Sequence, residues 1–254
     1  CVGGMGMQKI FESVVLPALF GDVRLNRAAQ LVWLRMHFSP VNTLSGHVKA
    51  MGVPKETLRR AVRMLIENQW AMEFRREGSR SPVIVPWMPP AVERMVVSEL
   101  REVRGEVGRV GEWNLECILY LTVDDRDVRR NARPEWFTLG VGDGRMEIDF
   151  WFWKHRVAIE FQGRQHFEYD PELYESRRDF IEQLRRDNIK AGLCMRHGIH
   201  YIEIPADKLS IGYVTDRVKP VLPLRPFPED SPLVRAVHEL CLSYVNAVSR
   251  KAAQ

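Results

Sequence analysis

The short run from Val157 to Gln162 constrains the fold more than any other part of the chain. Its apolar residues Val157, Ile159 and Phe161 recur at every second position, as they do in a β-strand that buries one face. The run is apolar enough for the centre of a sheet, yet Glu160 and Gln162 fall on the opposite face. A carboxylate in a core strand is costly unless it is paired or binds a metal ion. The chain is therefore predicted to contain a sheet with a polar site on one face.

A second carboxylate, Asp149, lies eleven residues before Glu160 in a neighbouring extended run. Carboxylates on adjacent strands can meet across the ladder. Their oxygens suit a hard divalent cation, so Mg²⁺ or Mn²⁺ is the expected cofactor. Such a cation activates water and stabilises the charge that develops on a phosphate during cleavage. Glu147 shares the face of Asp149, and it is either a supporting ligand or an exposed edge charge.

Helix and strand patterns alternate over the rear part of the chain. Asp143 and Gly144 form a pair typical of the tight turn between two antiparallel strands. The predicted elements, in chain order, are a helix over 112–123, strands over 136–141, 145–153 and 156–161, a helix over 171–196 and a strand over 200–204. The expected fold class is thus α/β, with the element order αβββαβ.

Apolar residues at helical spacing predict three helices in the front part of the chain, over residues 26–38, 44–51 and 55–70. Thr43 or Ser45 is available to cap the second helix, and Gly52 to stop it. A hairpin is predicted over 72–85, around the turn residues 77–79. The front part is therefore expected to be a small α+β domain.

Two successive prolines, Pro89 and Pro90, follow the hairpin and mark the first predicted domain boundary. An amphipathic helix is predicted over 91–110, and another over 232–251. The first of these either packs against its own chain or pairs two copies, which leaves a homodimer open. The predicted domains are a front domain over 1–88, a connecting helix over 89–110, a rear domain over 111–225 and a C-terminal helix over 226–254.

The charge of the chain is unevenly distributed. Residues 1–86 contain 12 Lys and Arg against 6 Asp and Glu, whereas the formal net charge of the whole chain is only +4. A basic front part joined to a more acidic rear part is typical of a DNA-holding module attached to a carboxylate-bearing one. No segment has the roughly 18–20 uninterrupted apolar residues of a membrane helix. The glycine-rich start lacks the pattern of a secretory signal. We therefore expect a cytoplasmic protein that does not contact a membrane.

The four cysteines of the chain contain no CxxC pair, which favours a reducing compartment over a disulfide framework. Cys194, His197 and His200 form a CxxHxxH spacing that resembles a zinc motif. Gly198 is expected to end a helix within that spacing, so the three side chains should diverge. We do not expect zinc there.

Three segments of the rear domain, EIDF, IEFQGRQH and RRDNIKAGLCMRHGIHYIEI, occur in a characteristic order. At these segments, over residues 111–209, the chain resembles the PD-(D/E)XK nuclease superfamily. The likeness is strongest to the branch of very-short-patch repair endonucleases and related homing enzymes. The resemblance implies a restriction-endonuclease-like αβββαβ core.

The resemblance also implies site residues. Asp149 and Glu160 would be the metal ligands, with the Phe161 carbonyl as a third. Gln162 stands where most of the superfamily has lysine, and glutamine offers a hydrogen bond in place of a charge. The other implied site residues are His166, Asp187, Lys190 and one glutamate of the first helix, either Glu112 or Glu116.

The group that transfers a proton is left open by the glutamine at position 162. Either His166 serves, since its ordinary pKa suits proton transfer, or Lys190 reaches in from the long helix. A third possibility is that the site has lost its chemistry. Asp187 lies on the apolar stripe of that helix, where it would point towards the sheet; a buried salt bridge is the alternative for it.

The segment LSGHVKAMGVPKETLRRAVRMLIENQWAMEF in the front domain resembles a winged helix-turn-helix. The resemblance implies that residues 54–63 form the recognition helix. The implied DNA contacts are Lys55, Thr57, Arg59, Arg60 and Arg63 on this helix and Arg75, Arg76 and Arg80 on the wing. Arginine and lysine neutralise phosphates, and arginine also reads guanine edges. The alternatives are a solvated basic face or a protein partner.

Together these features favour a metal-dependent DNA endonuclease that holds double-stranded DNA with a winged-helix module. The alternative is a non-catalytic DNA-binding regulator of replication or transcription with a degenerate nuclease fold. A nuclease directed at RNA is a third hypothesis. Cleavage assays with Asp149→Ala and Glu160→Ala would discriminate among them.

Overall fold

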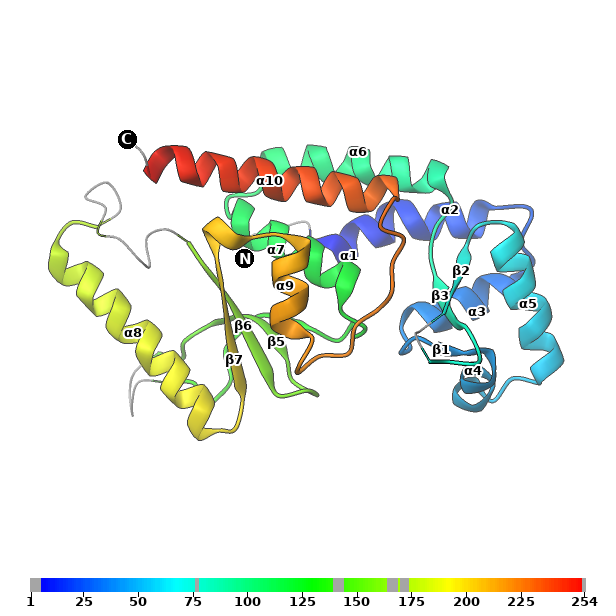
Figure 1. The fold of residues 1–254 in the computed structure, drawn as a ribbon, viewed down its shortest axis with the longest axis horizontal. Helices are drawn as coiled ribbons and strands as arrows, with labels where there is room; N and C mark the ends of the chain where they lie inside the picture. Colours follow the sequence, from blue (N-terminus) through cyan, green and yellow to red (C-terminus); the bar gives the residue numbers. More distant parts are fainter. Residues whose placement is uncertain (1–5, 76–77, 139–143, 164–168, 170–173, 253–254) are drawn as a thin grey trace. The chain divides into compact units, whose positions relative to one another are not determined.

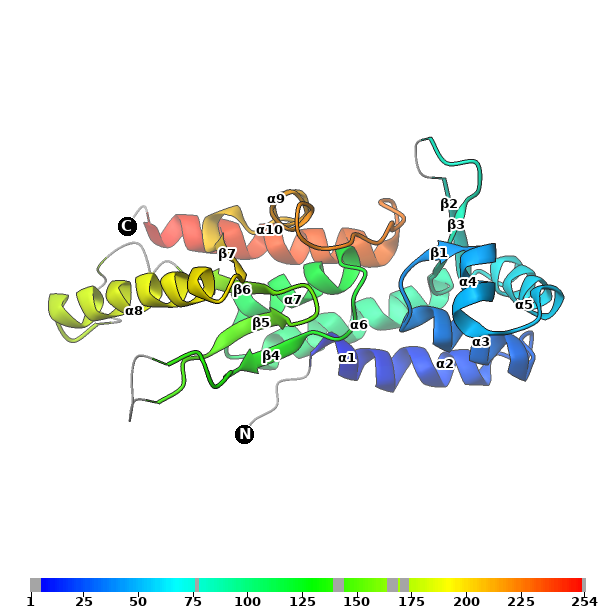
Figure 2. The ribbon, with the colours of Figure 1, turned by 90° about the horizontal axis from the view of Figure 1, so that it is seen from below.

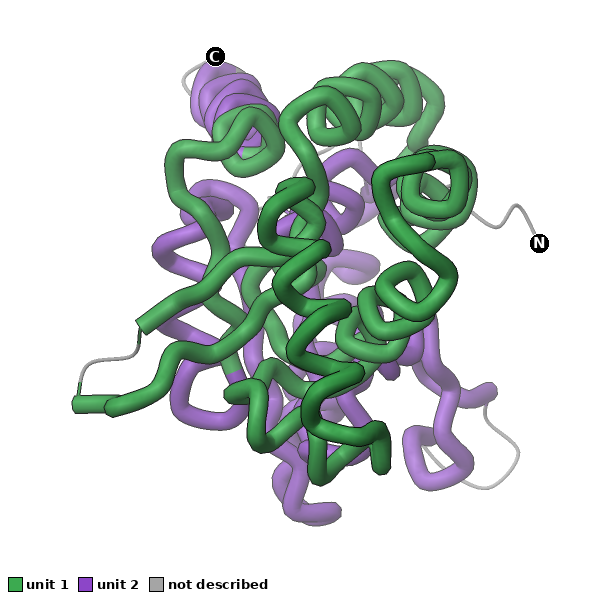
Figure 3. The backbone as a smooth tube through the Cα atoms, turned by 90° about the vertical axis from the view of Figure 1, so that its right-hand side faces the viewer, with its two compact units in different colours: residues 1–108, 119–126, 224–237 green, residues 109–118, 127–223, 238–254 purple. Residues whose placement is uncertain are grey.

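The computed structural model describes residues 6–75, 78–138, 144–163, 169 and 174–252 of the 254-residue chain (Figure 1). The protein is a mixed α/β chain that divides into two compact units (Figure 3). Unit 1 comprises residues 1–108, 119–126 and 224–237, and unit 2 comprises 109–118, 127–223 and 238–254. The predicted domains end at residues 88, 110 and 225. The compact units, which are defined by contacts within the structure, divide after residues 108, 118, 126, 223 and 237. None of the helices within the described ranges has the length and apolar content needed to cross a bilayer.

The N-terminal segment of unit 1 is helical, which the sequence analysis did not anticipate. Helix α1 (Met7–Ile10), a π-helical turn (Phe11–Val15) and helix α2 (Leu16–Gly21) follow one another without a break. Helix α1 and the π-helical turn pack against helix α6 (Pro90–Glu106) of the same unit. The helix expected over 91–110 therefore ends at Glu106. The glycines at 105 and 108 explain this earlier end, because glycine costs more conformational entropy in a helix than other residues do.

The centre of unit 1 alternates helices with short strands that form one antiparallel sheet, in the order β1-β3-β2. Asn26 caps the first of the helices by accepting a hydrogen bond from the Ala29 N–H at 2.9 Å. Thr43 caps the second through the Gly46 N–H, and Gly52 ends that helix with φ 64°. The elements are α3 (Arg27–His37), β1 (Asn42–Thr43), α4 (Leu44–Met51), α5 (Lys55–Glu67), β2 (Ala71–Phe74) and β3 (Val83–Pro86).

Helix α5 stops at Glu67, so its predicted end at residue 70 is wrong. Gln69 has a positive φ of 64°, and the Trp70 N–H turns back to donate to the Leu65 carbonyl. The buried Trp70 side chain donates its indole N–H to Asp22. Trp70 is apolar and so fits the helical pattern of the sequence. In the structure its side chain is buried in the core, but its backbone lies beyond the end of the helix.

Unit 2 is built on a four-stranded sheet in the order β4-β5-β6-β7, in which β6 and β7 are parallel and the other pairs antiparallel (Figure 2). Helix α8 contacts β7, and so does α9. The residues of α7 and α10 are shared between the two units. The elements are α7 (Val110–Thr122), β4 (Arg129–Ala132), β5 (Ile148–Phe152), β6 (Val157–Gln162), α8 (Arg177–Arg196), β7 (His200–Pro205), α9 (Ile211–Val218) and α10 (Pro232–Ala252).

The first strand of this sheet differs from the predicted one. Trp136 lies in a turn, Phe137 is not in a strand, and Thr138 makes only an isolated bridge to Arg145; residues 139–141 lie outside the described residues. Phe137 is fully buried in the core, so its apolar character reflects packing and not a strand. The true first strand is β4, which contains no large apolar residue and therefore gave no signal. The predicted turn at residues 143–144 falls partly outside the described residues.

Helix α8 begins later than predicted. Residues 174–176 are not helical, and the Ser176 hydroxyl caps the helix by accepting from the Asp179 N–H at 3.3 Å. Residues 171–173 of the predicted helix lie outside the described residues. Helix α9 was not predicted at all. The CxxHxxH residues separate in space: Cys194 is buried in the core, His197 caps α8 and His200 opens β7.

Candidate functional site

Asp149 and Glu160 lie where the pairing between β5 and β6 ends. The last registered pair towards this end is Phe150 with Ile159, so the next step of the register sets Asp149 opposite Glu160. In antiparallel strands such residues lie on the same face. The Asp149 carboxylate accepts a hydrogen bond from the Phe161 N–H at 2.8 Å (Oδ2 to N). The structure thus brings together the two carboxylates that the sequence singled out.

Glu160 is almost completely buried, with 4% of its surface exposed. Its Oε2 accepts a hydrogen bond from the Lys190 ammonium of α8 at 2.8 Å. Its Oε1 is buried and has no hydrogen-bond partner among the described residues. Burial, followed by repulsion from Asp149, raises the pKa of Glu160, although Lys190 opposes the shift. Burial likewise raises the pKa of Asp149. Ionising both carboxyl groups in this place is therefore costly unless a further positive charge comes near.

The two glutamates of α7 that the sequence could not separate have different surroundings. Burial, followed by the charge of Asp149, raises the pKa of Glu112, whereas Arg109 lowers it. Arg109 donates to Glu112 at 3.3 Å. Glu116 instead forms an ion pair with Arg130 of β4 at 2.7 Å. Glu112 is therefore the α7 glutamate that belongs with Asp149.

The supporting carboxylates are held by neighbouring side chains. Glu147 forms an ion pair with Arg133 at 3.0 Å and a longer one with Arg109 at 3.8 Å. Asp187 is buried on α8, as its place on the apolar stripe predicted, and accepts a hydrogen bond from Gln183 at 2.9 Å. Glu147 thus adds negative charge beside Asp149, whereas Asp187 is held within α8.

Gln162 is also buried, with 2% of its surface exposed, and its Nε2 donates to Glu203 of β7 at 3.2 Å. Glu203 was missed by the sequence analysis. It pairs with Glu160 in the parallel register, so Asp149, Glu160 and Glu203 occupy one row across three strands. Glu203 is itself exposed and alternates with the buried Ile202 and Ile204, which is the ordinary pattern of a strand with one solvated face, so the sequence did not mark it as a site residue.

Within the described ranges, no three His, Cys, Asp or Glu side chains converge closely enough to hold a metal ion on their own. His166 lies outside the described residues. The buried Oε1 of Glu160, which lacks a partner, nevertheless fits a cation bound by few protein oxygens. Mg²⁺ typically keeps several waters and takes only one or two carboxylates. Asp149 and Glu160 therefore fit Mg²⁺ or Mn²⁺ better than an ion that needs a complete protein cage.

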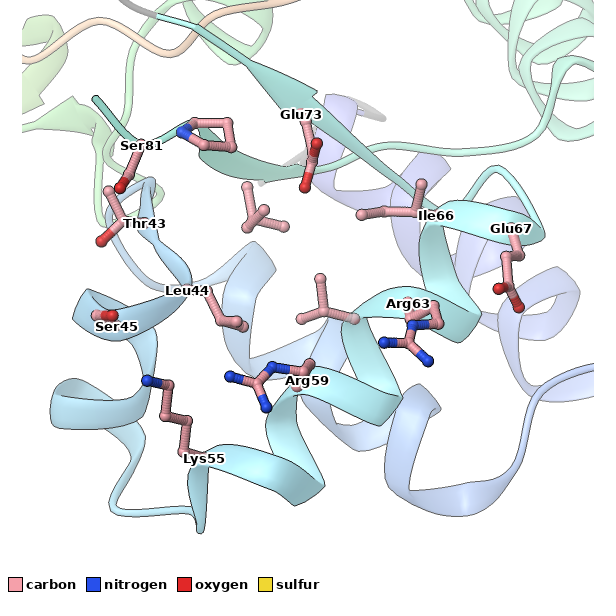
Figure 4. A pocket seen from close by; sticks show the side chains of 13 residues that line it. Thr43, Leu44, Ser45, Lys55, Arg59, Arg63, Ile66, Glu67, Glu73 and Ser81 are labelled. Atoms are coloured by element: carbon pink, nitrogen blue, oxygen red, sulfur yellow. The ribbon is translucent and has the colours of Figure 1, made fainter. Parts of the chain in front are cut away.

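In unit 1, the predicted DNA-contacting residues of α5 divide between a groove and the open surface. Lys55, Arg59 and Arg63, spaced four residues apart, line a groove of about 690 Å³ between α5, the start of α4 and the β2–β3 hairpin (Figure 4). Thr57 and Arg60 are exposed and do not line this groove. The basic side chains thus form a stripe along one side of the helix.

The groove is not purely basic. Glu67 and Glu73 also line it, and Arg59 is held by Glu56 at 2.6 Å. Of the residues predicted to form a wing, Arg75 and Arg80 are exposed, whereas Arg76 lies outside the described residues. The acidic side chains among the cations reduce the positive charge of the groove.

No protein-family model matches the chain, and no solved structure matches it. "Uncharacterized protein 307L" of Invertebrate iridescent virus 6 is 27% identical over 133 residues, which cover 48% of this chain and 66% of that protein. "Uncharacterized protein 094L" of Frog virus 3 (isolate Goorha) is 39% identical over 61 residues, 24% of this chain and 39% of that protein. "Uncharacterized protein 033L" of Invertebrate iridescent virus 3 is 26% identical over 102 residues, 40% and 48%. The matches span 39% to 66% of the length of these relatives.

Proposed function

We propose that the protein is a metal-dependent nuclease that hydrolyses phosphodiester bonds in double-stranded DNA. The observation that carries the proposal is the pair formed by the half-buried Asp149 and the buried Glu160, in which one Glu160 oxygen has no hydrogen-bond partner among the described residues. The order α7, β4, β5, β6, α8, β7 supports it, because it is the αβββαβ order of PD-(D/E)XK nucleases. A pair of carboxylates with raised pKa values in a sheet suits cation binding, since a cation relieves their repulsion.

Each residue of the site has a proposed task. Asp149 and Glu160 hold the cation, and the Phe161 carbonyl is the expected third ligand. When bound, Mg²⁺ or Mn²⁺ supplies an activated water and stabilises charge on the phosphate. The Lys190 ammonium, held 2.8 Å from Glu160, can stabilise negative charge on the phosphate or transfer a proton.

The surrounding acids tune this centre. Glu112 adds negative charge beside Asp149, and Asp187 is fixed on the same helix as Lys190. Neither Glu112 nor Asp187 is proposed to accept the proton of the attacking water. His166 remains the other expected proton-transfer group.

Unit 1 supports the same proposal through its element order. Helix α3, strand β1, helices α4 and α5 and the β2–β3 hairpin follow one another as in a winged helix-turn-helix. In that arrangement α5 would enter the major groove, and the hairpin would be the wing. Lys55, Arg59 and Arg63 would then face the DNA from the groove described above.

The direct test is cleavage of supercoiled plasmid with Mg²⁺ or Mn²⁺. The unaltered protein should nick or linearise the plasmid, whereas Asp149→Ala and Glu160→Ala should lose at least about 100-fold of the rate. Glu135→Ala is the matched control, because this carboxylate of unit 2 is 88% exposed and pairs only loosely with Arg145 at 3.5 Å. Single-stranded DNA and RNA are tested alongside. Equal inactivity of all four proteins on every substrate would contradict the proposal.

A non-catalytic DNA-binding regulator is the second candidate, and Gln162 in place of lysine is the observation that favours it. Such a protein would retain plasmid in a gel-shift assay without metal and would leave it uncut with metal. A nuclease would retain the plasmid without metal and would cut it with metal. The same protein preparations therefore discriminate between the two candidates.

A further inference from the structure

The side-chain amide of Gln162 is held by one of its two ends only. Its Nε2 donates to Glu203 Oε1 at 3.2 Å, while its Oε1 is buried without a hydrogen-bond partner in the described part of the chain. An amide oxygen buried without a partner costs free energy, because it has lost its hydrogen bonds to water. An arrangement of this kind is expected to persist where a ligand completes it.

Glu203 determines the orientation of the Gln162 side-chain amide. A carboxylate accepts hydrogen bonds and does not donate them, so only the NH₂ end of Gln162 can bond to Glu203. The amide oxygen is therefore turned away from Glu203. Gln162 presents an acceptor to the site, whereas a lysine at this position would present a donor and a positive charge.

The position of Gln162 along β6 brings this acceptor within range of the cation ligands. Glu160 and Gln162 are two residues apart and lie on one face of the strand, where side chains are separated by roughly 7 Å along the chain. Each side chain can reach a point between them. Glu160 Oε1 and Gln162 Oε1 are also the two buried oxygens of this strand that have no partner among the described residues.

Resting on the function proposed above, we propose that Gln162 is an oxygen ligand of the cation and that Glu203 is the residue that positions it. Glu203 fixes the amide so that its oxygen faces the metal. Lys190, which already contacts Glu160, supplies the positive charge that a lysine at position 162 would otherwise carry. The glutamine is thus a change in the ligand set and not a loss of function.

The test measures Mn²⁺ affinity of the intact chain by electron paramagnetic resonance of free Mn²⁺, without DNA. Gln162→Lys should weaken binding at least tenfold, because it replaces an oxygen by a cation. Gln162→Glu should tighten binding, because it adds a charged oxygen. Glu203→Gln should weaken it about tenfold, as loss of a residue that orients a ligand typically does. Asp149→Ala is the reference for a lost ligand, and Glu135→Gln the control that should bind as the unaltered protein does.

The outcomes separate this inference from the function on which it rests. If Asp149→Ala abolishes binding while Gln162→Lys and Glu203→Gln bind as tightly as the unaltered protein, Gln162 is not a ligand and the nuclease proposal stands. If the unaltered protein binds no Mn²⁺, both proposals fail. Thermal unfolding without metal checks that each variant folds. If Gln162→Lys does not fold, Gln162→Glu and Glu203→Gln decide the matter: unchanged affinity in both would overturn the inference.

Discussion

Asp124–Arg225 in unit 1 and Glu160–Lys190 in unit 2 are both buried ion pairs, but their remaining hydrogen-bonding capacity is used differently. Asp124 Oδ1 accepts from Arg225 Nε at 3.0 Å, and Asp124 Oδ2 accepts from the Val41 N–H at 2.6 Å. Arg225 also donates to the His37 carbonyl at 3.3 Å. Each oxygen of Asp124 therefore has a partner inside the protein.

The pair in unit 2 is incomplete. Lys190 satisfies one oxygen of Glu160, the other has no partner among the described residues, and Asp149 adds a second negative charge nearby. A buried ion pair stabilises a fold only when the geometry is good and the remaining polar atoms are bonded. The difference indicates that Asp124–Arg225 joins segments of unit 1, whereas Glu160–Lys190 leaves binding capacity for a ligand.

The largest effect is expected from breaking the complete pair. Asp124→Ala should lower the free energy of unfolding by about 3–5 kcal/mol, because it leaves Arg225 buried without its partner. The side chains of Asp124 and Arg225 are 4% and 3% exposed. Urea unfolding followed by circular dichroism measures the change.

Asp127→Ala is the matched control for this prediction. Asp127 pairs with Lys154 at 2.9 Å, but about half of each side chain is exposed (49% and 48%). Exposed pairs contribute only about 0–1 kcal/mol. A loss in Asp124→Ala no larger than that of the control would show that the buried pair stabilises the fold no more than an exposed one.

The incomplete pair should respond to a cation instead. At a Mn²⁺ concentration about 100 times its dissociation constant, binding should raise the free energy of unfolding by about 2.7 kcal/mol. Glu160→Gln should remove most of this gain, whereas Glu135→Gln should keep it. Thermal unfolding with and without Mn²⁺ measures both. An equal gain in Glu160→Gln would place the cation elsewhere in the molecule.

Contacts between neighbouring segments could be predicted from the sequence, whereas contacts between distant segments could not. The sequence predicted that Asp149 and Glu160 lie together, because both are in neighbouring strands that alternate every second residue and run antiparallel. It did not predict that Glu203 lies beside Glu160, because β6 and β7 are parallel strands separated in sequence by helix α8. Strand β4 gave no signal because its residues, Arg-Arg-Asn-Ala, join the sheet by hydrogen bonding to β5 and not by burial of apolar side chains.

In unit 1, a local rule predicted the helix cap at Thr43 but not the buried charge network. Asn26 and Thr43 cap their helices with side chains three residues from their partners, a distance that a sequence displays. Asp124 and Arg225 are 101 residues apart, and nothing local marks them as partners. The N-terminal helices were not predicted, because their apolar residues form a buried face only through contact with α6, which is distant in sequence.

The smallest predicted effect concerns pH and again separates the two units. Burial lowers the pKa of His37 well below its usual range, and the nearby charges of Arg126 and Arg225 lower it further. Below about pH 6.5 the unfolded chain binds a proton that the folded chain excludes, so stability falls as the pH falls towards the folded pKa. The expected loss is at most about 1.4 kcal/mol per pH unit for this residue. In unit 2 the sign is opposite: burial raises the pKa values of Asp149 and Glu160, so the folded chain takes up protons before the unfolded chain does and this contribution to stability grows as the pH falls.

His37→Phe isolates this contribution. The phenyl ring can keep the stacking on Phe11, whose ring centroid lies 4.2 Å from that of His37, but it has no charge to exclude. It also leaves the Tyr120 hydroxyl without its 3.1 Å contact, a cost that does not depend on pH. The slope of stability between pH 7 and 5.5, and not its absolute value, is therefore the quantity to compare. A residual slope is expected from His47, whose pKa burial also lowers. His238→Gln, at an exposed position, should keep the full slope, and an unchanged slope in His37→Phe would show that acid acts on the fold through other groups.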